Sequence, residues 1–346
     1  MAMADVTVLG AGIFGLSVAW ACVQRGARVR VIDPHGPGAG SSGGIVGALA
    51  PHVPEQWNDK KAFQFDSLMM AGDFWQEVEA ASGLSTGYAR LGRLQPVADE
   101  AALDLARIRA LSATELWQGH AVWEVLRADE GGDWMPASPS GWVIRDTLTA
   151  RLHPRMACAA LVDALRARGA EVVADHARQG AVVHATGAAG LAEIGTTLGR
   201  SFGNGVKGQA ALLALDMREA AQLFVDTVHV VPHADGTVAI GSTSERDYND
   251  PGSTDQQLDQ VIARARAAVP ALRDAAILER WAGVRPRSRS RAPVLGAHPV
   301  FKDQFIANGG FKIGFGMAPK VAQVMADLVL DGVDRIPPGF RPEASL

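Results

Sequence analysis

The protein has 346 residues, of which 48% are apolar, 20% are charged and 6% are aromatic. Its 33 basic and 37 acidic residues give a formal net charge of -4, so no overall positive field attracts nucleic acid or an anionic membrane. No apolar run approaches the ~18 residues that a membrane span needs. Two cysteines, Cys22 and Cys158, exclude a disulfide framework and a cysteine-rich zinc site, and no metal site is expected. We expect a cytoplasmic protein, because the first residues also lack the basic start and long apolar stretch of a secretory signal.

The N-terminal segment predicts a βαβ unit. Residues 6–9 form a short apolar run, residues 14–25 have helical spacing, and residues 27–32 form a second, β-branched run that ends at Asp33 and Pro34. Strand, helix and strand within about thirty residues indicate a parallel sheet.

The rest of the chain alternates between helical and strand-rich segments. Helices are expected at 62–81, 100–117, 153–168, 255–268 and 319–330, with loops at 36–44 and 131–139. Strands are expected at 142–144, 170–173, 181–185, 208–215, 228–232, 238–241, 277–283 and 305–307. The turn residues between 206 and 241 favour an antiparallel sheet there. The sequence therefore predicts an α/β fold with a doubly wound, Rossmann-type domain formed by residues 1–80, 143–203 and 289–346. A discontinuous, mostly antiparallel α+β substrate domain is expected at 81–142 and 204–288.

A glycine-rich turn lies between the first strand and the first helix. Gly10, Gly12 and Gly15 let a pyrophosphate approach backbone N–H groups at the helix N-terminus. Asp33 ends the second strand, where a carboxylate can accept hydrogen bonds from ribose hydroxyls and would repel a 2′-phosphate. The alternative, a plain glycine turn with a capping aspartate, is disfavoured by the order of the elements. The motif does not distinguish FAD from NAD.

Three further loops favour FAD. Residues 41–44 place hydroxyls and bare backbone just beyond Asp33, and Thr186 and Gly187 follow a strand at the edge where open sheets bind ligands. Residues 308–314 precede a helix near the end of the chain, and so offer N–H groups and a positive dipole to an anionic reduced flavin. Each of these loops by itself is more often an ordinary turn than a cofactor-binding loop. The order of all three along the chain favours the flavin.

Taken in order, these segments resemble the D-amino acid oxidase superfamily of flavoproteins, especially its glycine oxidase and sarcosine oxidase-like branch. The resemblance spans nearly the whole chain and rests on residues 8–15 with Asp33, 41–52, 185–187, 206–209, 240–244, 281–286 and 309–319. It implies an FAD enzyme that oxidises a Cα–N bond by hydride transfer to flavin N5. The imine then hydrolyses to a keto acid and ammonia, and oxygen is commonly reduced to hydrogen peroxide.

The resemblance also implies the cofactor contacts. They are Gly10, Gly12, Ile13, Phe14, Gly15, Asp33, Pro34, Ser41, Ser42, Val46, Gly47, Ala48, Thr186, Gly187, Gly309, Gly310, Phe311, Ile313, Gly314 and Phe315. Covalent attachment in sarcosine oxidases needs a cysteine near the last glycine-rich loop, and neither cysteine is close to it in sequence. Non-covalent FAD is therefore expected.

Four residues are candidates for the catalytic site. Arg285 matches the arginine that grips the substrate carboxylate, since a guanidinium can bind a carboxylate with two parallel hydrogen bonds. Lys312 falls where relatives carry a second arginine. His229 falls where glycine oxidases place a tyrosine and could titrate near neutral pH, although a solvent-facing strand histidine is an equal alternative. His52 follows the flavin-contacting loop. Four other histidines have no motif support and are expected to be structural or exposed: His120, His153, His176 and His298.

Arginines alternate along the segment that begins at Arg285. If the segment is extended, Arg285, Arg287, Arg289 and Arg291 share one face. A solvated basic edge is the favoured interpretation. The alternative is a substrate with a second anionic group.

The sequence leaves several functions open. An oxidase of glycine, sarcosine or a small D-amino acid that uses O2 is favoured over a dehydrogenase that uses a quinone or a protein acceptor. A tRNA-modifying branch and an NAD-dependent dehydrogenase are disfavoured, and a non-catalytic flavin-binding module stays open. The expected partners are a small amine or amino acid and the electron acceptor, with no nucleic acid and no membrane span, and homo-oligomerisation stays open.

Overall fold

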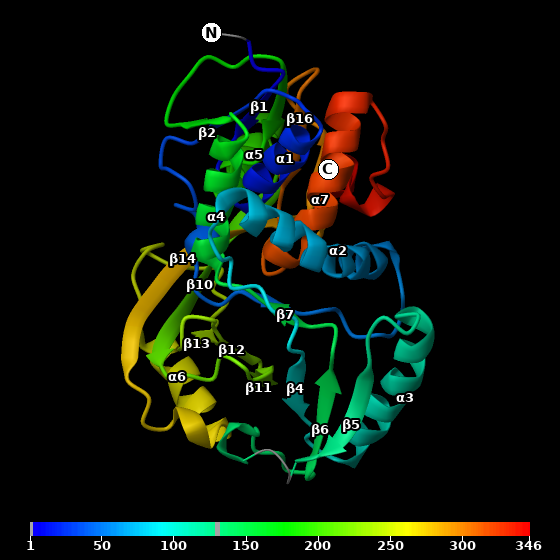
Figure 1. Ribbon diagram of the computed structural model, residues 1–346, viewed down its shortest axis with the longest axis vertical. Coiled ribbons are helices and arrows are strands. Elements are labelled where there is room, and N and C mark those ends of the chain that lie inside the picture. The colour runs from blue at the N-terminus through cyan, green and yellow to red at the C-terminus, as the bar shows by residue number, and fades with distance from the viewer. Residues whose placement is uncertain (1–2, 129–131) are drawn as a thin grey trace.

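The computed structural model describes residues 3–128 and 132–346. Gly131, at the start of the loop expected at 131–139, lies outside the described residues. Two sheets dominate the structure, one above the other in the view of Figure 1. A third, two-stranded sheet joins β3 (Ala48–Leu49) to β7 (Ala150–Arg151).

The first sheet has six strands in the order β15-β16-β9-β1-β2-β8. All neighbours are parallel except β15 and β16, which are antiparallel. The strands are β1 (Val6–Leu9), β2 (Val29–Ile32), β8 (Glu171–Val173), β9 (Ala181–His184), β15 (Val294–Ala297) and β16 (Phe305–Asn308). All four residues of β1 and of β2 are buried, as expected for strands covered on both faces. The doubly wound architecture predicted from the βαβ unit is confirmed.

The second sheet has eight strands in the order β14-β10-β13-β12-β11-β4-β6-β5. Its neighbours are antiparallel apart from β4 and β11. The strands are β4 (Arg93–Pro96), β5 (Trp123–Arg127), β6 (Trp142–Asp146), β10 (Gly203–Ala214), β11 (Gln222–Val225), β12 (Val228–Pro232), β13 (Thr237–Gly241) and β14 (Ile277–Ser288). We propose that the two sheets organise the two discontinuous domains given above.

Seven α-helices pack on these sheets within the described part of the chain. They are α1 (Ile13–Gln24), α2 (Asp59–Ser82), α3 (Glu100–Leu116), α4 (Pro154–Ala167), α5 (Gly187–Leu198), α6 (Gln256–Ala268) and α7 (Gly314–Asp331). Helices α1, α2, α4 and α7 bury one large apolar core with the six-stranded sheet, whereas α6 closes a second core against β10, β12 and β13. In the described residues no helix has both the length and the apolar run that crossing a bilayer requires.

Several strands were not predicted from the sequence, and two elements were predicted too short. The strands β4, β5, β11 and β15 were not predicted, because each has only four or five residues and no turn signature that sets it apart. The strand expected at 277–283 continues to Ser288, because it pairs along its whole length with β10. The predicted start of the last helix at residue 319 is wrong. Helix α7 begins at Gly314 and contains Pro319, which removes only one helical hydrogen bond.

Candidate active site

A cavity of about 1060 Å³ lies between the two large sheets. Its lining includes Leu9 and Ile32, at the carboxyl ends of parallel strands β1 and β2. It also includes Phe224, His229 and Arg285 from the antiparallel sheet. Its volume is at the upper end of the ~300–1,000 Å³ of small-molecule pockets and suits a large, extended ligand such as a dinucleotide.

The end of the cavity beside β1 is made of bare backbone. Gly10 has φ +104°, and a Cβ atom there would lie 2.3 Å from the Ala185 carbonyl oxygen. A Cβ atom on Gly15 would lie 1.9 Å from the Gly10 oxygen. Only glycine fits at either position. Helix α1 begins beside them with Gly12 as its N-cap and no side-chain cap, so its positive end meets the cavity.

Two polar side chains fix the walls of this end. Asp33 Oδ2 accepts a hydrogen bond from the Ala11 N–H at 2.8 Å, and its Oδ1 accepts one from the His35 N–H at 2.9 Å. Ser42 Oγ accepts one from the Ile13 N–H at 2.9 Å, which ties the loop at 36–44 to the first turn of α1. A carboxylate at the end of β2, bare glycines and the positive end of a helix are the groups that an adenosine dinucleotide needs, and FAD fits them.

The late glycine-rich loop forms the opposite wall. A Cβ atom on Gly310 would lie 2.9 Å from the Phe14 ring, so this loop packs directly on the first helix. The Asn308 amide donates to the Gly187 carbonyl at 3.0 Å, which joins the loop after β16 to the start of α5. Phe311 adopts φ +44° and its N–H donates to the Pro286 carbonyl at 3.0 Å. These contacts hold segments that are far apart in sequence around one cavity.

Nearly all of the residues expected to hold the cofactor line this cavity. Those that do are Gly10, Gly12, Ile13, Phe14, Asp33, Pro34, Ser41, Ser42, Val46, Gly47, Ala48, Thr186, Gly187, Gly309, Gly310, Phe311, Ile313, Gly314 and Phe315. Gly15 does not, because its part is the close packing of α1 against the glycine turn. The four catalytic candidates His52, His229, Arg285 and Lys312 line the same cavity.

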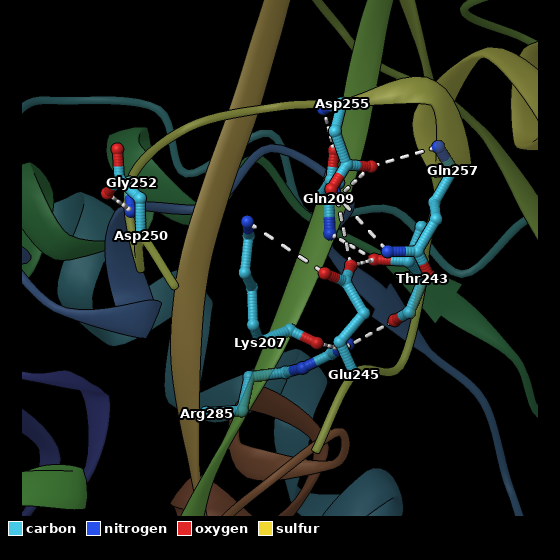
Figure 2. Close-up of polar contacts among 9 residues, drawn as sticks. All are labelled: Lys207, Gln209, Thr243, Glu245, Asp250, Gly252, Asp255, Gln257 and Arg285. Atoms are coloured by element: carbon cyan, nitrogen blue, oxygen red, sulfur yellow. Dashed lines mark hydrogen bonds and ion pairs between the residues drawn. The ribbon is translucent and has the colours of Figure 1, made fainter. Parts of the chain in front are cut away.

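The guanidinium of Arg285 is held by the protein itself (Figure 2). Its Nη2 donates to the carbonyl oxygens of Thr243 at 2.6 Å and Lys207 at 3.2 Å. Its Nη1 donates to Ser242 Oγ at 2.8 Å. Both Nη2 hydrogens are used, so the two-pronged edge expected to face a carboxylate is occupied. The second Nη1 hydrogen remains, and the buried Nε–H also has no partner among the described residues. Gly208 makes this placement feasible, because a Cβ atom there would lie 2.2 Å from Nη2.

A buried acidic residue lies behind Arg285. Glu245 is 7% exposed and lies 3.8 Å, from Oε2 to Nζ, from the 3% exposed Lys207. Its Oε1 accepts hydrogen bonds from Gln209 Nε2 at 2.9 Å and from Thr243 Oγ1 (Figure 2). Gln209 also donates to Asp255, the N-cap of α6. Burial lowers the pKa of Arg285 to about 10, and the charge of Glu245 opposes that shift.

Lys312 lies beside Phe311 in the late loop, near Arg285. Its Nζ is 5.8 Å from the centre of the Phe311 ring, and the guanidinium of Arg285 is 5.6 Å from the same ring. Partial burial, together with the charges of Arg285 and Arg287, lowers the pKa of Lys312. A carboxylate bound beside Lys312 would offset both the burial of its ammonium and the repulsion by the two arginines, so this position favours an anionic ligand.

Two histidines lie near these cations. Burial, reinforced by the charges of Arg93 and Lys312, lowers the pKa of His229 to about 3, so the expectation that it titrates near neutrality is wrong. Its Nδ1 is buried and has no hydrogen-bond partner among the described residues. The N–H of His52 donates to Gln64 Oε1 at 2.8 Å, and its ring Nδ1 contacts the same oxygen. Both imidazoles are available as neutral polar groups.

Several lining residues were missed by the sequence analysis. Arg93, Phe224, Ser242 and Trp281 come from four different strands or strand ends, and no motif joins them. Trp281 alone had a signal, since it begins the segment that contains Arg285. A Cβ atom on Gly283 would lie 2.4 Å from its ring. This contact explains the spacing of tryptophan and glycine in that segment.

The arginine run does not form one face. Arg285 and Arg287 belong to β14, which ends at Ser288. Arg289 donates from Nη1 to the Leu346 carbonyl at 2.7 Å, and Arg291 has φ +62° in the turn that follows. Arg285 and Arg287 therefore share one side of β14, each with its guanidinium 5.6 Å from the centre of the Phe311 ring, whereas Arg289 and Arg291 lie beyond the strand. Of the four, Arg285 lines the cavity.

The remaining candidates have structural surroundings. His153 and His298 are each 8% exposed and pack against His233 and His184 in tilted pairs, at ring-centroid distances of 4.7 and 4.4 Å. Cys158 is buried beneath the loop at 36–44, and burial raises its pKa to about 12. Within residues 3–128 and 132–346, no group of three or more histidine, cysteine, aspartate or glutamate side chains is arranged to hold a metal ion.

Comparison with known proteins assigns the family. The family model described as FAD dependent oxidoreductase (DAO) matches residues 5–328. A glycine oxidase of Bacillus licheniformis is 25% identical over 357 residues, which cover 94% of this chain and 93% of that protein.

Solved structures show the same fold. The glycine oxidase of Geobacillus kaustophilus superimposes with a TM-score of 0.83 at 21% identity and covers 98% of both chains. The iminodiacetate oxidase of Chelativorans sp. BNC1 superimposes with a TM-score of 0.84 at 22% identity, covering 97% of this chain and 98% of that one. The chain belongs to the FAD-dependent oxidoreductase (DAO) family, and it is an FAD-binding flavoprotein enzyme.

Proposed function

We propose that this FAD-dependent oxidoreductase oxidises the Cα–N bond of glycine, sarcosine or a small D-amino acid, and that it passes the electrons to O2. When bound, FAD supplies the two-electron acceptor for a hydride from the amine-bearing carbon. The products are an imine, which water converts to a keto acid and ammonia or methylamine, and hydrogen peroxide.

One observation carries the proposal: cationic side chains gather at the end of the cavity away from the dinucleotide cradle. Lys312 and the remaining Nη1 hydrogen of Arg285 can receive the carboxylate of an amino acid. Ser242, which accepts from Arg285, keeps its own hydroxyl hydrogen for the same oxygen. Charge-assisted hydrogen bonds of this kind orient a small substrate strongly.

The amine would lie beside His229. Because the pKa of this residue is about 3, its ring is neutral at working pH and places no positive charge beside the substrate amine, which binds in its neutral form. A neutral imidazole with an unpartnered nitrogen can accept a hydrogen bond from the amine or donate one to a substrate oxygen, depending on its tautomer. No acid or base is needed for hydride transfer from a neutral amine, so the residues here mainly position the substrate.

The cofactor is proposed to be held without a covalent bond. Cys158 is buried beneath the loop at 36–44 and does not line the cavity. Cys22 lies inside α1, and burial raises its pKa to about 12, so neither cysteine is poised as a thiolate. Denaturation followed by filtration should release the flavin, and flavin retained on the chain would contradict this.

The test is an anaerobic titration of the purified yellow protein with glycine, sarcosine, D-alanine and D-proline. Bleaching of the flavin absorbance by at least one of them is expected, and the absence of bleaching by any amine would favour a non-catalytic flavin-binding module. Readmission of air should restore the colour with stoichiometric hydrogen peroxide. Slow reoxidation in air with fast reoxidation by a quinone would identify a dehydrogenase instead.

A further inference from the structure

We propose that the cavity contains a second anion subsite centred on Arg93, and that the preferred substrate carries a second carboxylate in addition to the one beside its amine. The inference deepens the proposed function and rests on it. The subsite itself belongs to the described residues and can be tested without turnover.

Arg93 has donors to spare. It is 5% exposed, it lines the cavity, and its Nε donates to Asp146 Oδ2 at 2.9 Å. Asp146 is fully buried, and its other oxygen accepts from the Thr149 N–H at 2.8 Å. Neither terminal amino group of Arg93 hydrogen-bonds to another residue in the described part of the chain. A guanidinium that is anchored through Nε and bordered by a cavity presents its terminal amino groups to whatever fills that cavity.

The register of the sheet places Arg93 on the same side as His229, at the end of the cavity that also contains Arg285 and Lys312; this is called the substrate end. Strands β4, β11, β12 and β13 are consecutive neighbours. Arg93 pairs with Gln222, two residues before Phe224, and Phe224 pairs with His229. Because side chains alternate between the faces of a strand, Arg93, Phe224 and His229 project to the same face. The Arg93 guanidinium lies 5.9 Å from the centre of the Phe224 ring, which lies 4.7 Å from the His229 ring.

The charges at this end are unbalanced. Arg93, Arg285 and Lys312 line it. The acidic residues in the described lining are Asp33, Asp175 and Glu193, which follow β2, follow β8 and lie in α5, near the dinucleotide end. A substrate with one carboxylate beside Arg285 and Lys312 leaves Arg93 without an anionic partner other than Asp146. A second carboxylate would complete its hydrogen bonds and offset its burial.

The distance between the two groups of cations indicates how far apart the two carboxylates of the substrate should be. Three strand spacings separate Arg93 from Ser242, which follows the end of β13, and at about 4.8 Å each they span about 14 Å along the sheet. Long arginine and lysine side chains shorten the gap between the charged groups. An acidic amino acid or an N-carboxyalkyl amino acid, with two carboxylates several bonds apart, suits this gap better than glycine does. Arg287, the residue that the alternating arginines suggested for this part, does not line the cavity.

The experiment compares isosteric pairs on the FAD-loaded protein: D-glutamate with D-glutamine, D-aspartate with D-asparagine, and iminodiacetate with its monoamide. We expect kcat/KM to favour the diacid of at least one pair by about tenfold to a hundredfold, the range of one charge-assisted hydrogen-bonded contact. The variant Arg93→Met/Asp146→Asn removes the guanidinium without stranding a buried carboxylate, and it should bring this ratio close to one. Arg93→Lys should keep part of it.

Arg145→Met is the matched control. It removes one arginine from the neighbouring strand β6, where Arg145 is half exposed and pairs with Glu124 at 3.2 Å. The diacid preference should survive in this variant. Ratios near one in the wild type, or an unchanged ratio in Arg93→Met/Asp146→Asn, would overturn the proposal while leaving amine oxidation intact.

A binding measurement separates the subsite from the chemistry. Calorimetric titration with glutarate and with its monoamide needs no amine oxidation. Tighter binding of glutarate that disappears in Arg93→Met/Asp146→Asn supports the subsite even if no amine reduces the flavin. Equal binding of the two compounds by the wild type counts against the subsite even if amino acids are oxidised.

Discussion

The two ends of the cavity are built in different ways. The dinucleotide end consists of backbone, with Gly10, Gly12 and the start of α1 contributed by one short segment. The substrate end consists of side chains such as Arg93, His229 and Arg285, which reach it from three strands of the antiparallel sheet. A backbone cradle tolerates no added atoms and recognises a constant ligand, whereas a side-chain pocket can change its ligand preference when single side chains are exchanged. Under the proposed function, the backbone end recognises the cofactor and the side-chain end selects the substrate.

The largest expected effect tests the dinucleotide end. In Gly10→Ala the new Cβ would lie 2.3 Å from the Ala185 carbonyl at a φ of +104°, so the turn must move and FAD should be lost. The measurement is the ratio of flavin to protein absorbance after purification, which should fall to near zero. Gly72→Ala is the control, because nothing lies within 4 Å of a Cβ there, and it should retain the flavin. Full occupancy in Gly10→Ala would contradict a cradle made of bare backbone.

The same contrast explains what the sequence could predict. Gly10, Gly15 and Asp33 lie within one βαβ unit, so their spacing is local and determines both the fold class and the nucleotide end. Arg93 and Phe224 belong to four-residue strands whose neighbours in the sheet lie far away in the sequence. No local period identifies such residues, because their common face arises only from strand pairing. Arg285 was found through a family motif, but the occupation of its Nη2 hydrogens depends on carbonyls of two other segments.

The next effect tests whether the buried Glu245–Lys207 pair, which adjoins Arg285 but does not line the cavity, contributes to stability. In Glu245→Gln the acceptor oxygen for Gln209 can remain, but Lys207 keeps a buried charge without its counter-ion. Loss of one member of a buried pair predicts that the free energy of unfolding falls by about 3 kcal/mol. The measurement is chemical denaturation followed by fluorescence. Glu279→Gln, which breaks the partly exposed pair between Glu279 of β14 and Arg155 of α4, should cost less than about 1 kcal/mol. If the free energy of unfolding falls equally in Glu245→Gln and Glu279→Gln, the buried Glu245–Lys207 pair contributes no more to stability than the partly exposed one.

A smaller effect is expected at Lys312, where the fold is not at stake. Lys312→Met removes the ammonium proposed to receive the carboxylate, and KM should rise about tenfold, with a smaller change in kcat. Steady-state kinetics on the best substrate of the titration panel measures both constants. Lys302→Met, an exposed lysine elsewhere, serves as the control. A fall in kcat at constant KM would assign Lys312 to the chemical step instead of to substrate binding.

The smallest effect concerns pH and distinguishes the two cations that share the carboxylate. Binding needs the protonated form of Lys312, so affinity is constant below its pKa and falls as pH rises through it. Because partial burial and the charges of Arg285 and Arg287 lower that pKa, the fall should begin below the ~10.4 of an ordinary lysine.

An amine-free carboxylate such as propionate avoids titration of the substrate itself, and its inhibition constant can be followed from pH 7 to 10. In Lys312→Arg the guanidinium stays charged over this range, so the alkaline rise in the inhibition constant should move beyond the measured interval. If the rise persists unchanged in Lys312→Arg, the titrating group is elsewhere. Arg285, whose pKa burial lowers to about 10, would then be the cation that sets the alkaline limit.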